Sequence, residues 1–432
     1  MALKERWGPV LSGIPGAAEY YRQFRRFPHN ARLLLASTFL GSLSVGTFAV
    51  GYNLYLVELG VPGERLGYLV GAGSLASALA AIPAALLARR IGLKRLILWA
   101  AAALAVGTTL QILPWTYFTL LAGNTLGGVG GVMWAVALMP LLAASTNDAG
   151  RPYLFTLSAL IFLGVTLAGN VLAGYAPSAL AEAVGTNLDF GYLGVLGVTS
   201  LVSGLGLLPL LFLRHEQAVQ LPPREDLRLA LRERALLLKL LSIHGLIAFG
   251  AGMVIPFLNV YFVKSLGMAE EQFGLLAGAG VATRAALTVL GPLLAVRIGM
   301  ARTVGATQMA SIPLLLVLGF APGLGLAAFA YLARGAIMNM AQPLRSALYM
   351  ESVTEHLRAG FNSLLLVGWG VAWAAGAAIG GGLLERELHG VQFGITAGLY
   401  LLASAGLLRL FPGDVRGSGN EAPDLEEKVP GR

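Results

Sequence analysis

The stretch LLARRIGLKR, residues 86–95, gathers four cations after a run of more than twenty uncharged residues. Residues 293–302 read LLAVRIGMAR and match it at seven of ten positions, 207 residues further along. The same offset aligns ERLGYLVGAG at 64–73 with EQFGLLAGAG at 271–280. With one insertion, NLYLVELG at 53–60 matches NVYFVKSLG at 259–267. The sequence therefore predicts two similar halves of like orientation.

The composition is that of a membrane protein. Of the 432 residues, 56% are hydrophobic and only 12% are charged, and the mean hydropathy is +0.73. Soluble domains carry about twice that share of charge. The sequence contains no cysteine, so disulfides and thiolate metal sites are excluded, and we expect no metal or cofactor. We attribute the net charge of +8 to loops beside the membrane rather than to nucleic-acid binding.

Twelve segments are long and apolar enough to cross a bilayer, which takes about 20 residues per helix. The predicted fold is an all-α membrane protein with twelve transmembrane helices in two parallel six-helix repeats. The predicted spans are 33–59, 67–88, 96–113, 117–144, 154–175, 192–213, 240–263, 273–295, 304–320, 324–350, 361–384 and 393–410.

The cations predict the orientation of these spans. Twenty-four of the 30 Lys and Arg fall on the side that holds both termini, counting Arg409 at the end of the last span, and three fall in the opposite loops. Because positive charge marks cytoplasmic loops, we expect both termini on the cytoplasmic side of the membrane. We expect that membrane to be a cell membrane of the bacterial inner-membrane type. The predicted units are a cytoplasmic segment 1–32, a half 33–213, a linker 214–239, a half 240–411 and a cytoplasmic tail 412–432.

The sequence of the basic loop resembles a signature of the major facilitator superfamily, and the repeat agrees with that resemblance. The family signature between helices 2 and 3 runs Gly-x-x-x-Asp-Arg-x-Gly-Arg-Arg-Arg. Here its first and fifth positions hold Ala85 and Arg89 instead, so a reversed charge replaces the family's acid. The resemblance implies that this loop and its second copy close the inner side of the transporter. The residues to which this role is carried over are Arg89, Arg90, Gly92, Arg95, Arg297, Gly299 and Arg302.

Two weaker motifs indicate the subfamily. Asn124-TLG-Gly128-Val129-Gly130 resembles the family's helix 4 pattern with Asn for Arg, and residues 169–174 resemble the helix 5 pattern of antiporters without its Pro. The loops typical of sugar porters are missing. The resemblance implies a monomeric, non-enzymatic secondary transporter in the lipid bilayer that moves a small molecule by alternating access. It favours efflux of amphipathic compounds or metabolites.

Two arginines are the first candidates for substrate binding. Arg284 and Arg334 lie near the centres of their predicted spans, where no carboxylate is expected. Intramembrane cations are costly and usually face a cavity or a partner. Their guanidinium groups would suit a carboxylate or phosphate, which makes an organic-anion transporter or exchanger the alternative function. Equally open is a structural role, in which each arginine binds helix-end carbonyls or water.

Further polar and aromatic side chains in the spans are weaker candidates for the binding site. Asn124, Asn339 and Gln342 could bind a ligand or join helices to one another. Trp134 and Trp369 could line an amphipathic pocket, against packing or contact with lipid as the alternative.

Coupling to protons lacks an obvious carrier at the middle of the membrane. The candidates are Glu58, His244 and Glu351. For His244 the competing expectation is a solvated or helix-capping side chain near a span's end. A third function also stays open, a transporter-like membrane sensor that moves nothing.

Overall fold

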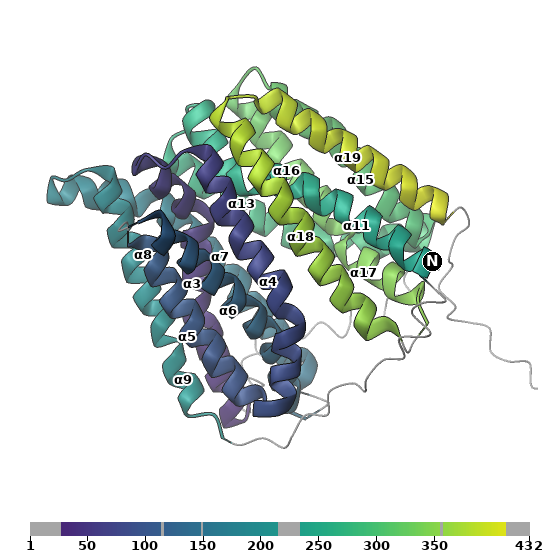
Figure 1. Ribbon diagram of the computed structural model, residues 1–432, viewed down its shortest axis with the longest axis horizontal. Helices are drawn as coiled ribbons and strands as arrows, with labels where there is room; N and C mark the ends of the chain where they lie inside the picture. The colour runs from purple at the N-terminus through teal and green to yellow at the C-terminus, as the bar shows by residue number, and fades with distance from the viewer. Residues whose placement is uncertain (1–26, 114–115, 148–149, 215–233, 355–356, 412–432) are drawn as a thin grey trace, which may run out of the picture.

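The computed structural model describes residues 27–113, 116–147, 150–214, 234–354 and 357–411, and this part of the chain consists of helices joined by short turns (Figure 1). Eleven helices are long and apolar enough to cross a membrane, and a twelfth crossing is a pair of helices bent by 41°. In chain order the spans are α3 (His29–Glu58), α4 (Gly63–Ile91), α5 (Leu93–Ile112), α6 (Tyr117–Ala144), α7 (Arg151–Val184), α8 (Leu188–Leu205) with α9 (Leu207–Leu211), α11 (Arg234–Val254) continued by short turns to Ser265, α13 (Glu270–Thr288) with α14 (Leu290–Ile298), α15 (Met300–Phe320), α16 (Leu324–Met340) with α17 (Gln342–Glu351), α18 (Arg358–Glu385) and α19 (His389–Leu410).

Each predicted span is present, but several differ from the prediction in length or continuity. The fifth runs from Arg151 to Val184 instead of 154–175, and its end projects beyond the bundle beside α8 (Figure 1). Spans seven, eight and ten of the second half are broken at Val254, Val289 and Ala341.

A proline follows each of these breaks within three residues. Pro256, Pro292 and Pro343 each lack an N–H, and the ring of each crowds the carbonyl four residues earlier. Proline alone does not decide the outcome, because Pro83 and Pro177 lie inside unbroken helices.

The two halves share one packing arrangement. In the first half, α3 packs on α7 and α8, while α6 packs on α4 and α5. In the second half, α11 packs on α18 and α19, while α16 packs on α13 and α15. These are the same neighbours in the same order, so the parallel repeat that the sequence predicts is confirmed.

Local geometry repeats as well. Gly92 has φ 83° and ψ 157°, and Gly299 has φ 91° and ψ 157°. This is a region that essentially only glycine occupies. The Arg151 Nε donates to the carbonyl of Ala143 at 2.9 Å, and Arg358, 207 residues on, donates likewise to Met350 at 2.9 Å.

The halves meet along two glycine seams, α4 against α18 and α7 against α13. A Cβ added to Gly67 would lie 2.4 Å from the carbonyl oxygen of Ala377, and one added to Gly174 would lie 2.9 Å from Cα of Gly274. Small residues allow helix backbones to approach this closely in membranes. Gly67 and Gly274 are 207 residues apart, so the two seams are related by the repeat.

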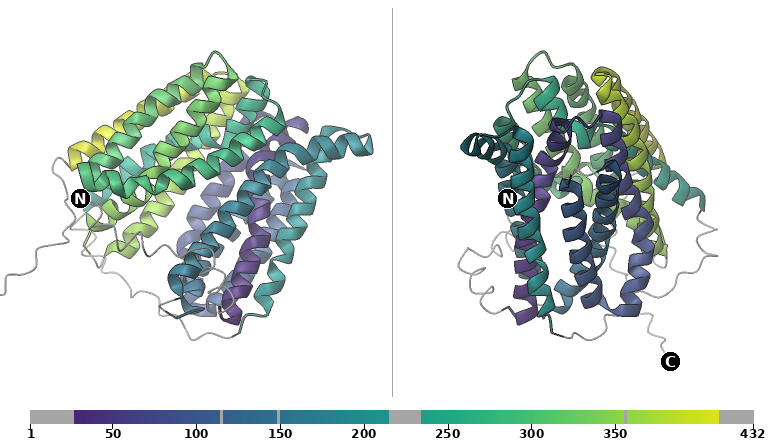
Figure 2. Two further views of the ribbon diagram at one scale, coloured as in Figure 1. Left: turned by 180° about the vertical axis from the view of Figure 1, so that it is seen from behind. Right: turned by 60° about the vertical axis from the view of Figure 1, so that its left-hand side comes forward.

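The seams close one end of the molecule and leave the other open. We call the end that holds Gly92 and Gly299 the basic end, and the end that holds Glu58 and Glu385 the opposite end. Figures 1 and 2 show the halves together at the opposite end and apart at the basic end. Beyond the contact of Ala78 with Gly370, α4 and α18 diverge, and Leu86 and Leu366 are each 54% exposed.

Candidate functional site

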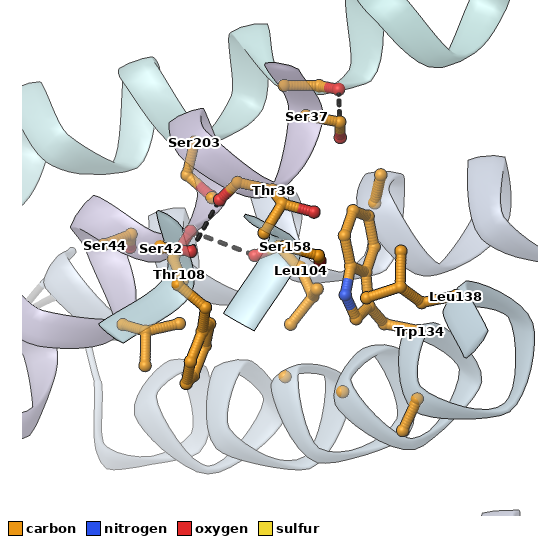
Figure 3. Close-up of a pocket in the computed structure, with 18 of the residues that line it drawn as sticks. Ser37, Thr38, Ser42, Ser44, Leu104, Thr108, Trp134, Leu138, Ser158 and Ser203 are labelled. Atoms are coloured by element: carbon orange, nitrogen blue, oxygen red, sulfur yellow. Dashed lines mark hydrogen bonds between the residues drawn. The ribbon is translucent and has the colours of Figure 1, made fainter. Parts of the chain in front are cut away.

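The first half contains a cavity of about 590 Å³ among α3, α5, α6, α7 and α8. Figure 3 shows serine and threonine side chains gathered on one side and the indole of Trp134 beside Leu138 on the other. Among the described residues that line the cavity, none is ionisable. The cavity is therefore amphipathic and uncharged, and it contains Trp134, one of the side chains that the sequence singled out.

The hydroxyl groups of this cavity are largely committed as donors. Ser37 donates to the carbonyl of Gly206 at 2.7 Å, Ser42 to Thr38 at 2.6 Å, and Thr108 to Leu104 at 3.0 Å. A hydroxyl that has donated its proton to a backbone carbonyl still offers lone pairs. The polar wall therefore presents acceptors, which suit the O–H and N–H groups of a solute.

In the second half, the positions 207 residues on carry different side chains. Ser37, Leu138 and Phe162 line the cavity, and their counterparts are His244, Arg345 and Trp369. The His244 and Trp369 rings lie 4.9 Å apart, and Arg345 Cζ lies 5.8 Å from the Trp369 ring centroid. In the second half, aromatic rings and a guanidinium group therefore occupy the positions equivalent to these three cavity-lining residues of the first half.

The structure gives the two predicted arginines different partners. Arg334 is only 5% exposed, and its Nη2 donates to the Tyr400 hydroxyl at 3.1 Å, with Nε unpartnered among the described residues. Arg284 is half-buried and lies against α16 at Gly335, where an added Cβ would meet its Nη1 at 3.8 Å. Arg334 thus joins α16 to α19, whereas the Arg284 side chain lies between α13 and α16.

The remaining binding candidates are placed in three ways. Asn124 Nδ2 donates to the Tyr52 hydroxyl at 2.6 Å and so joins α6 to α3. Asn339 Nδ2 donates within its own helix to Gly335 at 2.7 Å. Gln342 is exposed at the first position of α17. The helix break at Ala341 separates Arg334 from Gln342, although a continuous helix would place them on one face.

The basic-end residues flank two similar turns. Arg89, Arg90, Arg95, Arg297 and Arg302 are all exposed around Gly92 and Gly299. A cation that the sequence analysis did not select, Lys94, donates through Nζ to the carbonyl of Leu213. Lys94 therefore ties the start of α5 to the end of the first half, as a cation near helix-end carbonyls does.

The three coupling candidates have separate environments. Glu58 forms an ion pair with Lys264 at the opposite end. The expectation of a solvated or helix-capping His244 is wrong, because its ring packs between Trp369 and Tyr349, at 4.9 and 5.7 Å. His244 lies near the end of its span, but the ring contacts with two other helices decide the environment of its side chain. Glu351 is exposed as the last residue of α17.

The opposite end is closed by a symmetric set of contacts that the sequence analysis missed. Asn53 Nδ2 donates to the carbonyl of Pro256 at 2.6 Å, and Asn259 Nδ2 donates to the carbonyl of Val50 at 2.8 Å. The two donors are 206 residues apart, as are the two acceptors. Both asparagines begin the aligned segments NLYLVELG and NVYFVKSLG, so the repeat itself carried a usable signal.

Comparisons with known proteins agree on a single family. The model of the Major Facilitator Superfamily matches residues 34–247 and 240–430. The solved nucleoside transporter NupG is 13% identical, with a TM-score of 0.71 over 89% of this chain and 100% of that one.

Two further solved structures are similar. A bacterial homolog of the human lysosomal transporter Spinster, inward-facing and unoccupied, is 16% identical, with a TM-score of 0.67 over 88% of this chain and 98% of that one. A D-xylose–proton symporter is 15% identical, with a TM-score of 0.63 over 88% and 95%. No curated protein sequence matches the chain.

Proposed function

This chain belongs to the major facilitator superfamily and is a multi-pass secondary membrane transporter, and from that premise we propose that it moves amphipathic organic solutes by alternating access. The observation that carries the proposal is the cavity of the first half. Its wall combines Trp134 and aliphatic groups with hydroxyl acceptors and no charge (Figure 3). Ligand sites of this kind are mostly apolar with a few polar groups that fix orientation.

Alternating access is supported by the contrast between the two ends. The glycine seams and the two asparagine hydrogen bonds close the opposite end, while the halves diverge at the basic end. If the basic end lies in the cytoplasm, as its cations favour, this conformation opens inward. When the basic end closes, the turns at Gly92 and Gly299 would then approach the basic ends of α18 and α7, because α4 packs on α18 and α13 packs on α7.

Efflux is the direction we propose, on the strength of the antiporter-like pattern at 169–174. Deletion of the gene would then sensitise cells to amphipathic drugs, whereas a growth or excretion defect alone would favour an organic-anion exchanger. For that alternative, Arg334 is already engaged by Tyr400, so Arg284 is the better placed of the two predicted arginines. A membrane sensor would show no flux of any solute.

Counterflow in proteoliposomes tests the site. Radiolabelled nucleosides, phenylalkanoates, phenylalkylamines and their neutral amides would be compared in wild type, Trp134→Ala and Trp99→Ala. Trp99 lies on α5 and is 54% exposed, so its loss serves as the matched control. We expect flux of at least one amphipathic solute to fall with Trp134→Ala alone. Equal flux in the two variants would remove the cavity from the transport pathway.

A further inference from the structure

One side-chain cluster of the second half is not used by the transport cycle described above. His244 of α11, Arg345 and Tyr349 of α17, and Trp369 of α18 form what we call the arginine–aromatic cluster. Its ring centroids are separated by 4.9 Å for His244 and Trp369 and by 5.7 Å for His244 and Tyr349. Arg345 Cζ lies 5.8 Å from the Trp369 ring centroid. Three spans thus bring a cation and three rings together.

The charge of Arg345 is not balanced by a carboxylate of the described residues. In the part of the chain that the structure describes, no ion pair joins Arg345 to an acid. The guanidinium is half-buried and rests beside the Trp369 ring, which attracts it only weakly. A cation inside a membrane protein without a counter-ion usually marks a functional site.

Two polar atoms of the cluster also lack partners. Tyr349 is 1% exposed, and neither its hydroxyl nor Nδ1 of His244 has a hydrogen-bond partner among the described residues. Buried polar atoms are nearly always hydrogen-bonded in native proteins. A guanidinium fork, a hydroxyl and an imidazole nitrogen therefore stand together with unused hydrogen-bonding capacity.

We propose that the arginine–aromatic cluster binds the carboxylate of an amphipathic monoanion. The guanidinium offers two parallel N–H donors to a carboxylate, and the Tyr349 hydroxyl can donate a third hydrogen bond. One fixed cation matches one negative charge, whereas a phosphate dianion would leave excess charge inside the protein. The ring centroids of Trp373 and Trp369 lie 5.9 Å apart. These two rings would form an apolar wall for the body of the ligand.

This inference rests on the proposed function and narrows its substrate class. The uncharged cavity of the first half would accept the donor-bearing, apolar part of solutes, while the second half would select a carboxylate. The selection differs from the anion site expected at Arg284 and Arg334, because Arg345 is on the other side of the break at Ala341.

Equilibrium binding to the purified full-length protein tests the proposal. The probes share one scaffold: 4-phenylbutyrate, its neutral amide, 4-phenylbutylamine and 4-phenylbutylphosphonate, each followed by calorimetry. We expect the carboxylate to bind most tightly. Arg345→Gln should weaken its binding by roughly 10- to 100-fold, because hydrogen bonds to charged groups are strong. Arg345→Lys, which keeps the charge but not the fork, should fall between wild type and Arg345→Gln.

Tyr349→Phe separates a binding role from a structural one. It should weaken carboxylate binding by about tenfold. Thermal stability of the ligand-free protein should stay unchanged or rise, because the hydroxyl has no hydrogen-bond partner among the described residues to lose. Arg409→Gln, at an exposed position near the end of α19, is the matched charge control and should bind as wild type does. Equal affinity for carboxylate and amide, or an unaltered affinity in folded Arg345→Gln or Arg345→Lys, would overturn the proposal.

Counterflow of the same probes keeps the two proposals apart. Binding of the carboxylate through Arg345 without any flux would uphold this site and remove the proposed transport. Flux of the neutral amide, with no preference for the carboxylate and no effect of Arg345→Gln, would uphold transport and remove this site.

Discussion

The two asparagine hydrogen bonds that join the halves at the opposite end predict how the conformational equilibrium can be shifted. Asn53 and Asn259 donate to Pro256 and Val50, and we expect these bonds to break when the opposite end opens. A hydrogen bond contributes about 1 kcal/mol on average. Removing both therefore disfavours the present conformation by about 2 kcal/mol, or about 30-fold in the equilibrium constant. A population of about 95% would fall to about 40%.

Distances between spin labels at the basic end measure this shift. The sequence contains no cysteine, so Leu86→Cys on α4 and Leu366→Cys on α18 give a clean pair of labels at exposed positions. Wild type should show mainly long distances. Asn53→Ala with Asn259→Ala should add a large population of short distances, because the basic end closes as the opposite end opens.

The matched control is Asn187→Ala, an exposed asparagine before α8 whose side chain makes no cap hydrogen bond. It should leave the distances unchanged. The two single variants should each produce about half the free-energy shift, since the repeat makes their bonds equivalent. An unchanged distribution in the double variant, or an effect confined to one asparagine, would refute this reasoning.

Three other predictions follow from separate contacts. Gly92→Ala and Gly299→Ala should each lower the free energy of unfolding by about 1–3 kcal/mol, because both residues have positive φ. Thermal unfolding measures the loss, with Gly398→Ala as the control, because a Cβ at Gly398 would meet open space. Tyr400→Phe removes the hydroxyl that accepts from buried Arg334, so the melting temperature should fall while solute affinity stays constant; a changed affinity in titrations would assign Arg334 to the binding site. The Glu58–Lys264 pair is partly exposed, with side chains 25% and 38% accessible, so Glu58→Gln should change stability by less than about 1 kcal/mol, and a larger loss in denaturant titrations would contradict that estimate.

The fold could be predicted from sequence because two signals are linear along the chain. Apolar segments of bilayer length and a repeat with a constant offset need no knowledge of contacts. The positions of the helix breaks were harder to predict from the sequence. Pro292 ends a helix near Thr288, whereas Pro83 is accommodated within α4, and the difference depends on how neighbouring helices pack. Periodicity alone could therefore not separate Arg334 from Gln342.

The candidate site was harder to predict, because burial and partners decide what a polar side chain does. Arg334 and Arg345 look alike in the sequence, yet Arg334 has Tyr400 as a hydrogen-bond acceptor, whereas the charge of Arg345 lies beside the Trp369 ring. His244 was expected near solvent, and the Tyr349 and Trp369 rings that cover it come from helices more than 100 residues away.

The repeat offers a way to locate specialisation that neither hydropathy nor motifs supply. Where equivalent positions keep their residues, as Gly92 and Gly299 do, they keep a backbone geometry that both halves need. Where the residues diverge, as Ser37 and Leu138 do from His244 and Arg345, the constraint is no longer the fold. Divergence from hydroxyl and aliphatic groups to imidazole and guanidinium costs desolvation energy, and intramembrane cations of this kind usually have a function. This divergence supports our proposal that the two halves recognise different parts of one solute, and it singles out Ser37 with His244 and Leu138 with Arg345 as the pairs to exchange first.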